Sequence, residues 1–319
     1  MLFKNNINLY KGIIEEPVYD KSIENLLGDV EEYIRKEIWE MQEKSQRVTE
    51  KTGVYFYVDG TPYSEEDEVK RCIANLLKYA EEENWKNCVQ IIKDCEVLTM
   101  SPLDRMSLYL NSGNVFSVLG RLNDAKNYYE NALKITEKKK IREIYKDEAI
   151  YIKGATLGNI GLIYSDKGEL DEALNYLQEA LKIFMEINSL SLVIQALINI
   201  ASIHFEKGFP VDGFKYLGMA ISGAPSPDER NKAFSALLGT LKNLIAHNEW
   251  EKIEAINVMY SANILRVEDE NLVNFLKALR EYALWMRTSE SEHERNYKEI
   301  KQGLPEDFRT FLKDLIEEG

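Results

Sequence analysis

The sequence predicts an all-α protein built as a solenoid of helical hairpins, and three observations support this. A pattern of apolar, small and aromatic residues returns in register along the middle of the chain. A glycine interrupts each copy where one helix must end and the next begin. Charged residues fill the gaps at the three- and four-residue spacing of amphipathic helices. A plain helical bundle would share only the last feature.

Residues 1–63 do not follow the pattern, and they are expected to form a helical N-terminal extension. Apolar residues in 20–51 share one face of a long helix that needs a partner. The β-prone run 53–60 contains an Asp-Gly turn and fits either a short hairpin or an ordered loop. The aromatic residues 55–57 either pack on the first hairpin or form a surface for a partner.

The repeated hairpins are expected over residues 64–265. The clearest copy contains Leu157, Ile160, Gly161, Tyr164, Gly168, Ala173, Leu177 and Ala180. The following copy contains Leu197, Ile200, Ala201, Gly208, Gly213, Leu217 and Ala220. An earlier copy contains Tyr109, Gly113, Phe116, Gly120, Ala125, Tyr129 and Ala132. Degenerate copies around Leu76 and Leu241 bring the expected number of hairpins to about five.

These residues resemble the tetratricopeptide repeat, although Gly161 and Ala201 are 40 residues apart and the common repeat has about 34 residues. Small residues such as Ala173 suit the crossing point of two helices that approach to about 8–10 Å. Gly120, Gly168 and Gly208 are expected in the turns between helices. The resemblance implies a superhelix whose first helices line a concave groove.

Residues 266–319 are expected to form C-terminal helices. One helix is predicted over 269–287, a polar Ser-Glu segment follows, and a final short helix begins near Pro305. Phe308, Phe311, Leu312 and Leu315 give this last helix an apolar face. That face either caps the solenoid or forms a dimer contact, so the oligomeric state is left open.

Charge and hydropathy exclude several classes of function. The net charge of −14 opposes nucleic acid as a partner, and the basic stretch 138–142 is interpreted as a solvated helix end. The apolar stretch 190–205 is interrupted by polar residues and is too short to span a membrane. The start of the chain does not resemble a signal peptide, so a cytoplasmic location is expected.

Neither the cysteines nor the histidines indicate chemistry. The three cysteines lack metal-site spacing, and Cys88 and Cys95 take small-residue positions, so all are expected to be reduced packing residues. His204 takes the place that Tyr164 has one repeat earlier and is interpreted as a packing residue with satisfied hydrogen bonds. His247 and His293 lie far from it in the sequence. No enzyme, metal or cofactor is expected.

A polar stripe on the first helices is the candidate binding site. Asn111, Asn159 and Asn199 occupy one register of the three best copies, and a carboxamide can pair with both groups of a peptide unit. The same faces carry Asn114, Asp166, Gln195, Ser202 and Glu206. The acidic residues at the end of the stripe favour a protein or peptide segment with Lys or Arg. Chance or shared ancestry of the repeats would also explain the asparagines.

This asparagine row looks like the ladder of the kinesin light chain and mitotic-spindle orientation adaptor families, in which peptides lie along the groove. Here Gly239 and Ala74 interrupt it in the flanking copies. The resemblance implies a non-enzymatic scaffold that binds an extended segment.

The alternative rests on an architectural similarity to the Rap family of peptide-controlled regulators. That similarity implies that a groove ligand shifts N-terminal helices that engage a signalling protein, and no catalytic residue is transferred from it. The sequence shows no helix-turn-helix domain of the kind that begins the related DNA-binding receptors.

Overall fold

A computed structural model describes residues 68–224, 226–262, 264–265 and 270–317. The expected N-terminal extension, with its long helix and its aromatic run 55–57, lies outside these residues. The described part of the chain is helical, and it contains no strand. It divides into two compact units, residues 68–192 and 193–317.

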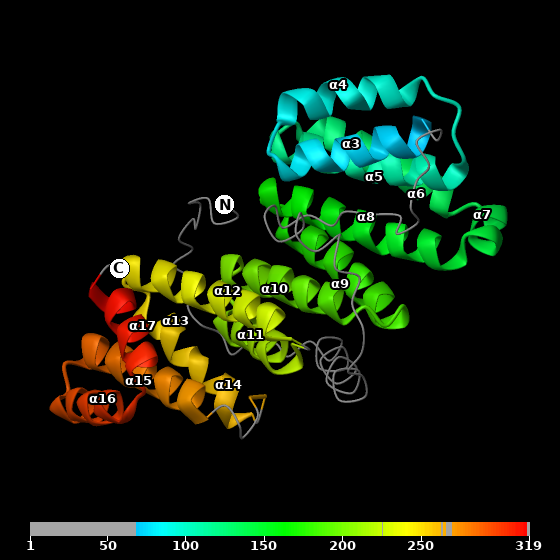
Figure 1. Ribbon diagram of the computed structural model, residues 1–319. Helices are drawn as coiled ribbons and strands as arrows, with labels where there is room; N and C mark the ends of the chain where they lie inside the picture. Colours follow the sequence, from blue (N-terminus) through cyan, green and yellow to red (C-terminus); the bar gives the residue numbers. More distant parts are fainter. Residues whose placement is uncertain (1–67, 225, 263, 266–269, 318–319) are drawn as a thin grey trace. The chain divides into compact units, whose positions relative to one another are not determined.

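The first unit consists of antiparallel helical hairpins joined by short turns (Figure 1). Its helices are α3 (Glu68–Glu81), α4 (Trp85–Glu96), α5 (Pro102–Val118), α6 (Leu122–Thr136), α7 (Lys139–Ile144), α8 (Lys146–Asp166) and α9 (Leu170–Glu186). The pairs α3/α4, α5/α6 and α8/α9 are the expected hairpins, and α7 is an additional short helix between the second and third pairs. The next helix, α10 (Leu190–Glu206), begins at the end of this unit and continues into the second.

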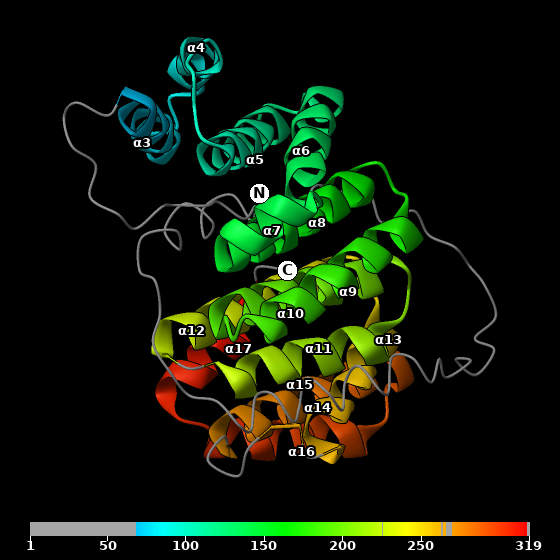
Figure 2. The same ribbon diagram turned by 90° about the vertical axis from the view of Figure 1, so that its right-hand side faces the viewer.

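The second unit contains two further hairpins and a group of C-terminal helices (Figure 2). Its helices after α10 are α11 (Pro210–Gly223), α12 (Pro227–Ala246), α13 (Trp250–Glu254), the 3₁₀ helix η1 (Ala255–Asn257), α14 (Val258–Ser261), α15 (Glu270–Thr288), α16 (Ser291–Gly303) and α17 (Glu306–Glu317). The second helix of the last hairpin is therefore broken into α13, η1 and α14, which the sequence did not indicate.

Small residues lie where the helices of a hairpin cross, as expected. A Cβ atom on Gly161 would lie 2.9 Å from Leu177 Cγ and 3.1 Å from the carbonyl oxygen of Ala173. A Cβ atom on Gly113 would lie only 2.4 Å from the ring of Tyr129. Ala173 is fully buried at the same crossing. The repeated small residues are therefore a consequence of close helix packing.

The three turn glycines adopt the left-handed conformation that the sequence predicts. Their φ angles are 73° at Gly120, 77° at Gly168 and 81° at Gly208. In the two degenerate hairpins Glu83 and Asn248 take this position, with φ angles of 56° and 57°. The turn geometry is therefore kept even where glycine is absent, at the conformational cost that a side chain imposes there.

Replacing Gly168 by alanine is expected to destabilise the α8/α9 hairpin by about 1 kcal/mol, because only its positive φ angle opposes a side chain. No atom lies within 4 Å of the position that the new Cβ would take. Hydrogen exchange of the α8 and α9 amides measures the effect. Gly303→Ala is the control, because its surroundings are equally open and its φ angle is not positive. An equal loss in both variants would contradict the explanation.

The C-terminal helices differ from expectation in one respect. The polar Ser-Glu segment is the start of α16, in which Tyr297 is buried with its ring 5.2 Å from that of Tyr282. Tyr297 and the hydrogen bonds of His293 and Asn296 to Glu281 attach this polar helix to α15, and a hydropathy pattern does not reveal such contacts. The final helix α17 packs on α12 and α15, with the ring of Phe308 5.6 Å from that of Phe275. Its apolar face thus has a partner within its own unit.

Candidate functional site

The first unit contains a row of buried polar side chains on α5 and α8. Ser107, Asn111 and Asn114 follow each other at four and three residues along α5, so they project from one side of it. Their exposed fractions are 3%, 0% and 0%, and Asn159 on α8 is 1% exposed. Buried amides need hydrogen-bond partners, because an unpaired one costs about 1–3 kcal/mol.

Hydrogen bonds connect this row across two repeats. The Asn159 side chain donates from Nδ2 to Asn114 Oδ1 at 2.7 Å. The hydroxyl of Tyr129 donates to the same oxygen, also at 2.7 Å. Burial holds the pKa of Tyr129 well above its usual range, so this hydroxyl remains a donor. Asn111 Nδ2 donates to Ser107 Oγ at 3.5 Å, within its own helix.

Asn159 and Asn111 are equivalent positions of two repeats, and their expected role as a ladder that contacts a bound peptide stays a prediction. Between the two repeats, the hydrogen bond of Asn159 reaches Asn114, one turn beyond Asn111 on α5. Tyr129 is the residue that sequence reasoning missed: it was assigned only to the packing of the repeat. Its position directly opposite Gly113, next to Asn114, is the signal that was available.

The second unit holds the corresponding polar side chains of α10. Asn199 is 6% exposed and accepts a hydrogen bond from Gln195 Nε2 at 3.2 Å. Ser202 is half-buried, and Glu206 at the end of the helix is exposed. In the first unit Asp166 is likewise exposed at the end of α8. Each stripe therefore runs from a buried amide to an exposed carboxylate.

A stacked pair of aromatic rings recurs in each of the three central hairpins. The ring centroids are 5.2 Å apart in Phe116–Tyr128, 5.3 Å apart in Tyr164–Tyr176 and 5.2 Å apart in His204–Tyr216. In every pair the two residues are 12 positions apart, one on each helix. His204 thus occupies the aromatic position of the repeat, as the sequence predicts.

His204 differs from the other members of these pairs because it carries unsatisfied ring nitrogens. It is 2% exposed, and neither nitrogen has a hydrogen-bond partner among the described residues. Its interpretation as a satisfied packing residue is therefore wrong in that respect. Burial lowers its pKa from 6.5 to about 4, against the opposing effect of Asp212.

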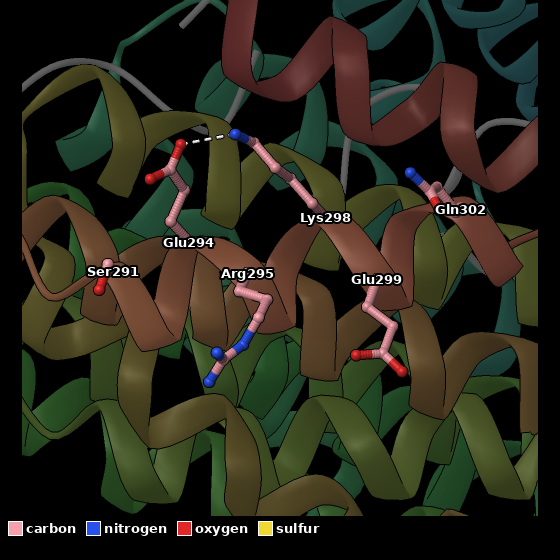
Figure 3. Close-up of a pocket in the computed structure, with 6 residues that line it drawn as sticks. All are labelled: Ser291, Glu294, Arg295, Lys298, Glu299 and Gln302. Carbon is pink, nitrogen blue, oxygen red and sulfur yellow. Dashed lines mark hydrogen bonds and ion pairs between the residues drawn. The ribbon is translucent and has the colours of Figure 1, made fainter.

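A shallow depression of about 340 Å³ lies along α16 (Figure 3). It is lined by Ser291, Glu294, Arg295, Lys298, Glu299 and Gln302. All six belong to one helix, and Lys298 pairs with Glu294 at 2.6 Å while Arg295 and Glu299 point to the other side. A surface of mixed charge on a single helix does not enclose a ligand.

The described residues contain no cluster of three or more His, Cys, Asp or Glu side chains that could hold a metal ion. The histidine His293 instead lies with Nδ1 2.8 Å from Glu281 Oε2, in a contact between α15 and α16. Over the same part of the chain, no helix has the length and apolar character to span a membrane.

Two parts of the chain match family models described as tetratricopeptide repeat. One match covers residues 107–139, which include most of α5 and all of α6. The other covers residues 154–184, which include parts of α8 and α9. No curated protein matches the chain.

Proposed function

Because the chain is a tetratricopeptide repeat protein, we propose that it is a non-enzymatic scaffold that binds a segment of another protein along the first helices of its repeats. The observation that carries this proposal is the polar row of Asn111, Asn114 and Asn159. Amides placed in the interior of a solenoid stabilise it less than apolar residues of similar size would. Their presence is explained if they pair with the main chain of a ligand.

Because Asn111, Asn114 and Asn159 are at most 1% exposed, binding must uncover these amides and exchange their existing hydrogen bonds for new ones. Asn114 accepts bonds from Asn159 and Tyr129, and none of the asparagine amides in the stripe is without a partner. Replacing one such bond by a bond to a peptide group is close to neutral in free energy. The amides would therefore set the register of the ligand, and other contacts would supply the affinity. Asp166 and Glu206 would favour a ligand with Lys or Arg.

The test starts with peptides selected from a random library on the full chain. We expect sequences rich in Lys and Arg whose affinity falls about five- to tenfold in the Asn159→Ala variant, because one hydrogen bond is worth about 1 kcal/mol. Asn199→Ala is expected to act in the same direction. Calorimetry measures the affinities, and circular dichroism with urea titration checks that the variants remain folded.

The control for this test is Asn131→Ala, an equal truncation at an exposed position of α6. Peptides that bind all three variants as well as the wild type would move the site away from the asparagines. A large ligand-induced shift of the N-terminal residues would favour the peptide-responsive regulator instead.

A further inference from the structure

The short helix α7 is an insertion between two repeats. Gly113 and Gly161 are 48 residues apart, whereas Gly161 and Ala201 are 40 apart. The helix has six residues and packs on α6 and α8 through Ile141, its only buried side chain. The other side chains of α7 are therefore not needed for the stacking of the hairpins.

This insertion gathers cations in an acidic protein. Lys138, Lys139, Lys140, Arg142 and Lys146 are all exposed. The chain as a whole carries a net charge of −14, so the remainder is more acidic still. Adjacent like charges repel each other, and such a local conflict is typical of a functional surface.

The cations of the insertion are poorly neutralised by the protein itself. Glu143 is the only acidic residue within 138–146, where it lies 3.8 Å from Lys139 in a pair that is mostly exposed, and Glu137, Asp147 and Glu148 flank the segment. The other four cations form no ion pair within the part of the chain that the structure describes. An exposed pair of this kind contributes at most about 1 kcal/mol. Within 138–146 itself five cations face one carboxylate, and this local excess of positive charge is what a partner would meet.

The same surface also offers an apolar contact. Ile144 is 58% exposed at the end of α7. Lys140 lies four residues before it and therefore shares its face of the helix. A ligand that fits this face combines carboxylates with an apolar side chain.

We propose that α7 and its flanks, residues 138–146, form a docking site for an acidic segment of a partner protein, with an apolar residue of that segment against Ile144. Charge complementarity selects this occupant. A short segment meets only the local positive field, because charges beyond about 10 Å are screened at physiological salt. A nucleic acid or an anionic membrane is long enough to meet the acidic remainder of the chain and would be repelled. This surface is separate from the polar row on α5 and α8.

The test uses the full chain and a fluorescein-labelled peptide of Glu and Asp residues around a single Leu. Fluorescence anisotropy is expected to show binding in about 50 mM salt and a several-fold loss of affinity in about 200 mM salt. The triple variant Lys138→Gln, Lys140→Gln, Arg142→Gln is expected to bind the peptide at least about tenfold more weakly. The Ile144→Ser variant should weaken binding of this peptide, and not of a version in which Ser replaces the Leu.

The matched control changes the same net charge elsewhere in the same unit, through Lys86→Gln, Lys93→Gln and Lys182→Gln at exposed positions of α4 and α9. Its affinity is expected to stay within about twofold of the wild type, because these charges lie outside the docking site.

Equal losses in both triple variants would overturn the proposal, as would a wild-type protein that does not bind the peptide at low salt. Binding of phosphatidylserine vesicles or of oligothymidylate through α7, without binding of the peptide, would overturn it in favour of that ligand. Asn159→Ala should leave the peptide affinity unchanged.

Discussion

Removal of the disulfide between Cys72 and Cys95 is expected to destabilise the first hairpin by about 3 kcal/mol. The bond joins α3 to α4, with the two Cα atoms 5.8 Å apart, and it closes a loop over a sequence separation of 23 residues. Closing such a loop restricts the unfolded chain and so favours the folded hairpin. The measurement is hydrogen exchange of the α3 and α4 amides in a Cys72→Ala, Cys95→Ala variant, where protection should fall about a hundredfold.

The control for this prediction is Cys88→Ala in the same hairpin. Cys88 is buried and unbridged, and burial raises its pKa to about 11, so its thiol is a poor nucleophile for exchange with the disulfide. Its truncation removes packing and a weak hydrogen bond from Sγ to the Leu76 carbonyl oxygen at 3.9 Å, and it is expected to cost about 1 kcal/mol. Thiol titration of the unfolded, unreduced protein should find one thiol per chain. Three thiols would contradict the bond.

The bond corrects the expectation that all three cysteines are reduced. Spacing alone gave no reason to pair Cys72 with Cys95, because residues 23 positions apart meet only if the chain reverses between them. The hairpin brings Cys72 on α3 opposite Cys95 on α4. Since disulfides are rare in the reducing cytosol, the thiol count also bears on the expected compartment. Three thiols would restore the expectation of a reducing environment.

The hairpin architecture could be predicted because its causes are local. A glycine with a positive φ angle and a small residue at a helix crossing are each required by backbone geometry, as Gly168 and Gly161 show. Such requirements leave the same residue type at the same place in every copy. At Glu83 the turn accepts a side chain. The glycine is therefore missing from the sequence pattern there, although the turn conformation is kept.

The details of the polar row could not be predicted because they depend on the offset between neighbouring hairpins. Repeat periodicity aligns Asn111 with Asn159, but α7 lies between the two hairpins as an insertion. The hydrogen bond from the amide of Asn159 to Asn114 depends on this offset. The hydroxyl of Tyr129 reaches the same oxygen because Gly113 leaves room for its ring. A sequence lists the residues of each helix but does not give the offset between two of them.

Replacing His204 by phenylalanine is expected to remove a large part of the acid sensitivity of the second unit. The histidine is buried against the ring of Tyr216, and its pKa is about 4 in the folded protein against an ordinary value of 6.5. The folded state therefore favours neutral histidine. The contribution of neutral His204 to the free energy of unfolding is complete above pH 6.5. It is lost as the pH drops from 6.5 to about 4. The loss over this window is about 2–3 kcal/mol.

The charges around His204 set the size of this effect. Asp212 on α11 favours protonation, whereas Lys207 and Lys215 oppose it. The carboxylate of Asp212 also lies 3.6 Å from Lys215 Nζ, so it interacts with this cation as well as with the histidine. Desolvation therefore dominates, and protonation leaves a buried cation without a dedicated partner.

Urea unfolding of the wild type and the His204→Phe variant at several pH values between 4 and 6.5 measures the difference. Phenylalanine suits the position because Phe116 makes the same stack in another hairpin. The two stability curves should converge toward pH 6.5 apart from a constant offset, with the variant more stable because it buries no unsatisfied nitrogen. The control His247→Gln changes an exposed histidine and should keep the wild-type slope. Parallel curves for the wild type and His204→Phe would show that His204 is not what makes this unit sensitive to acid.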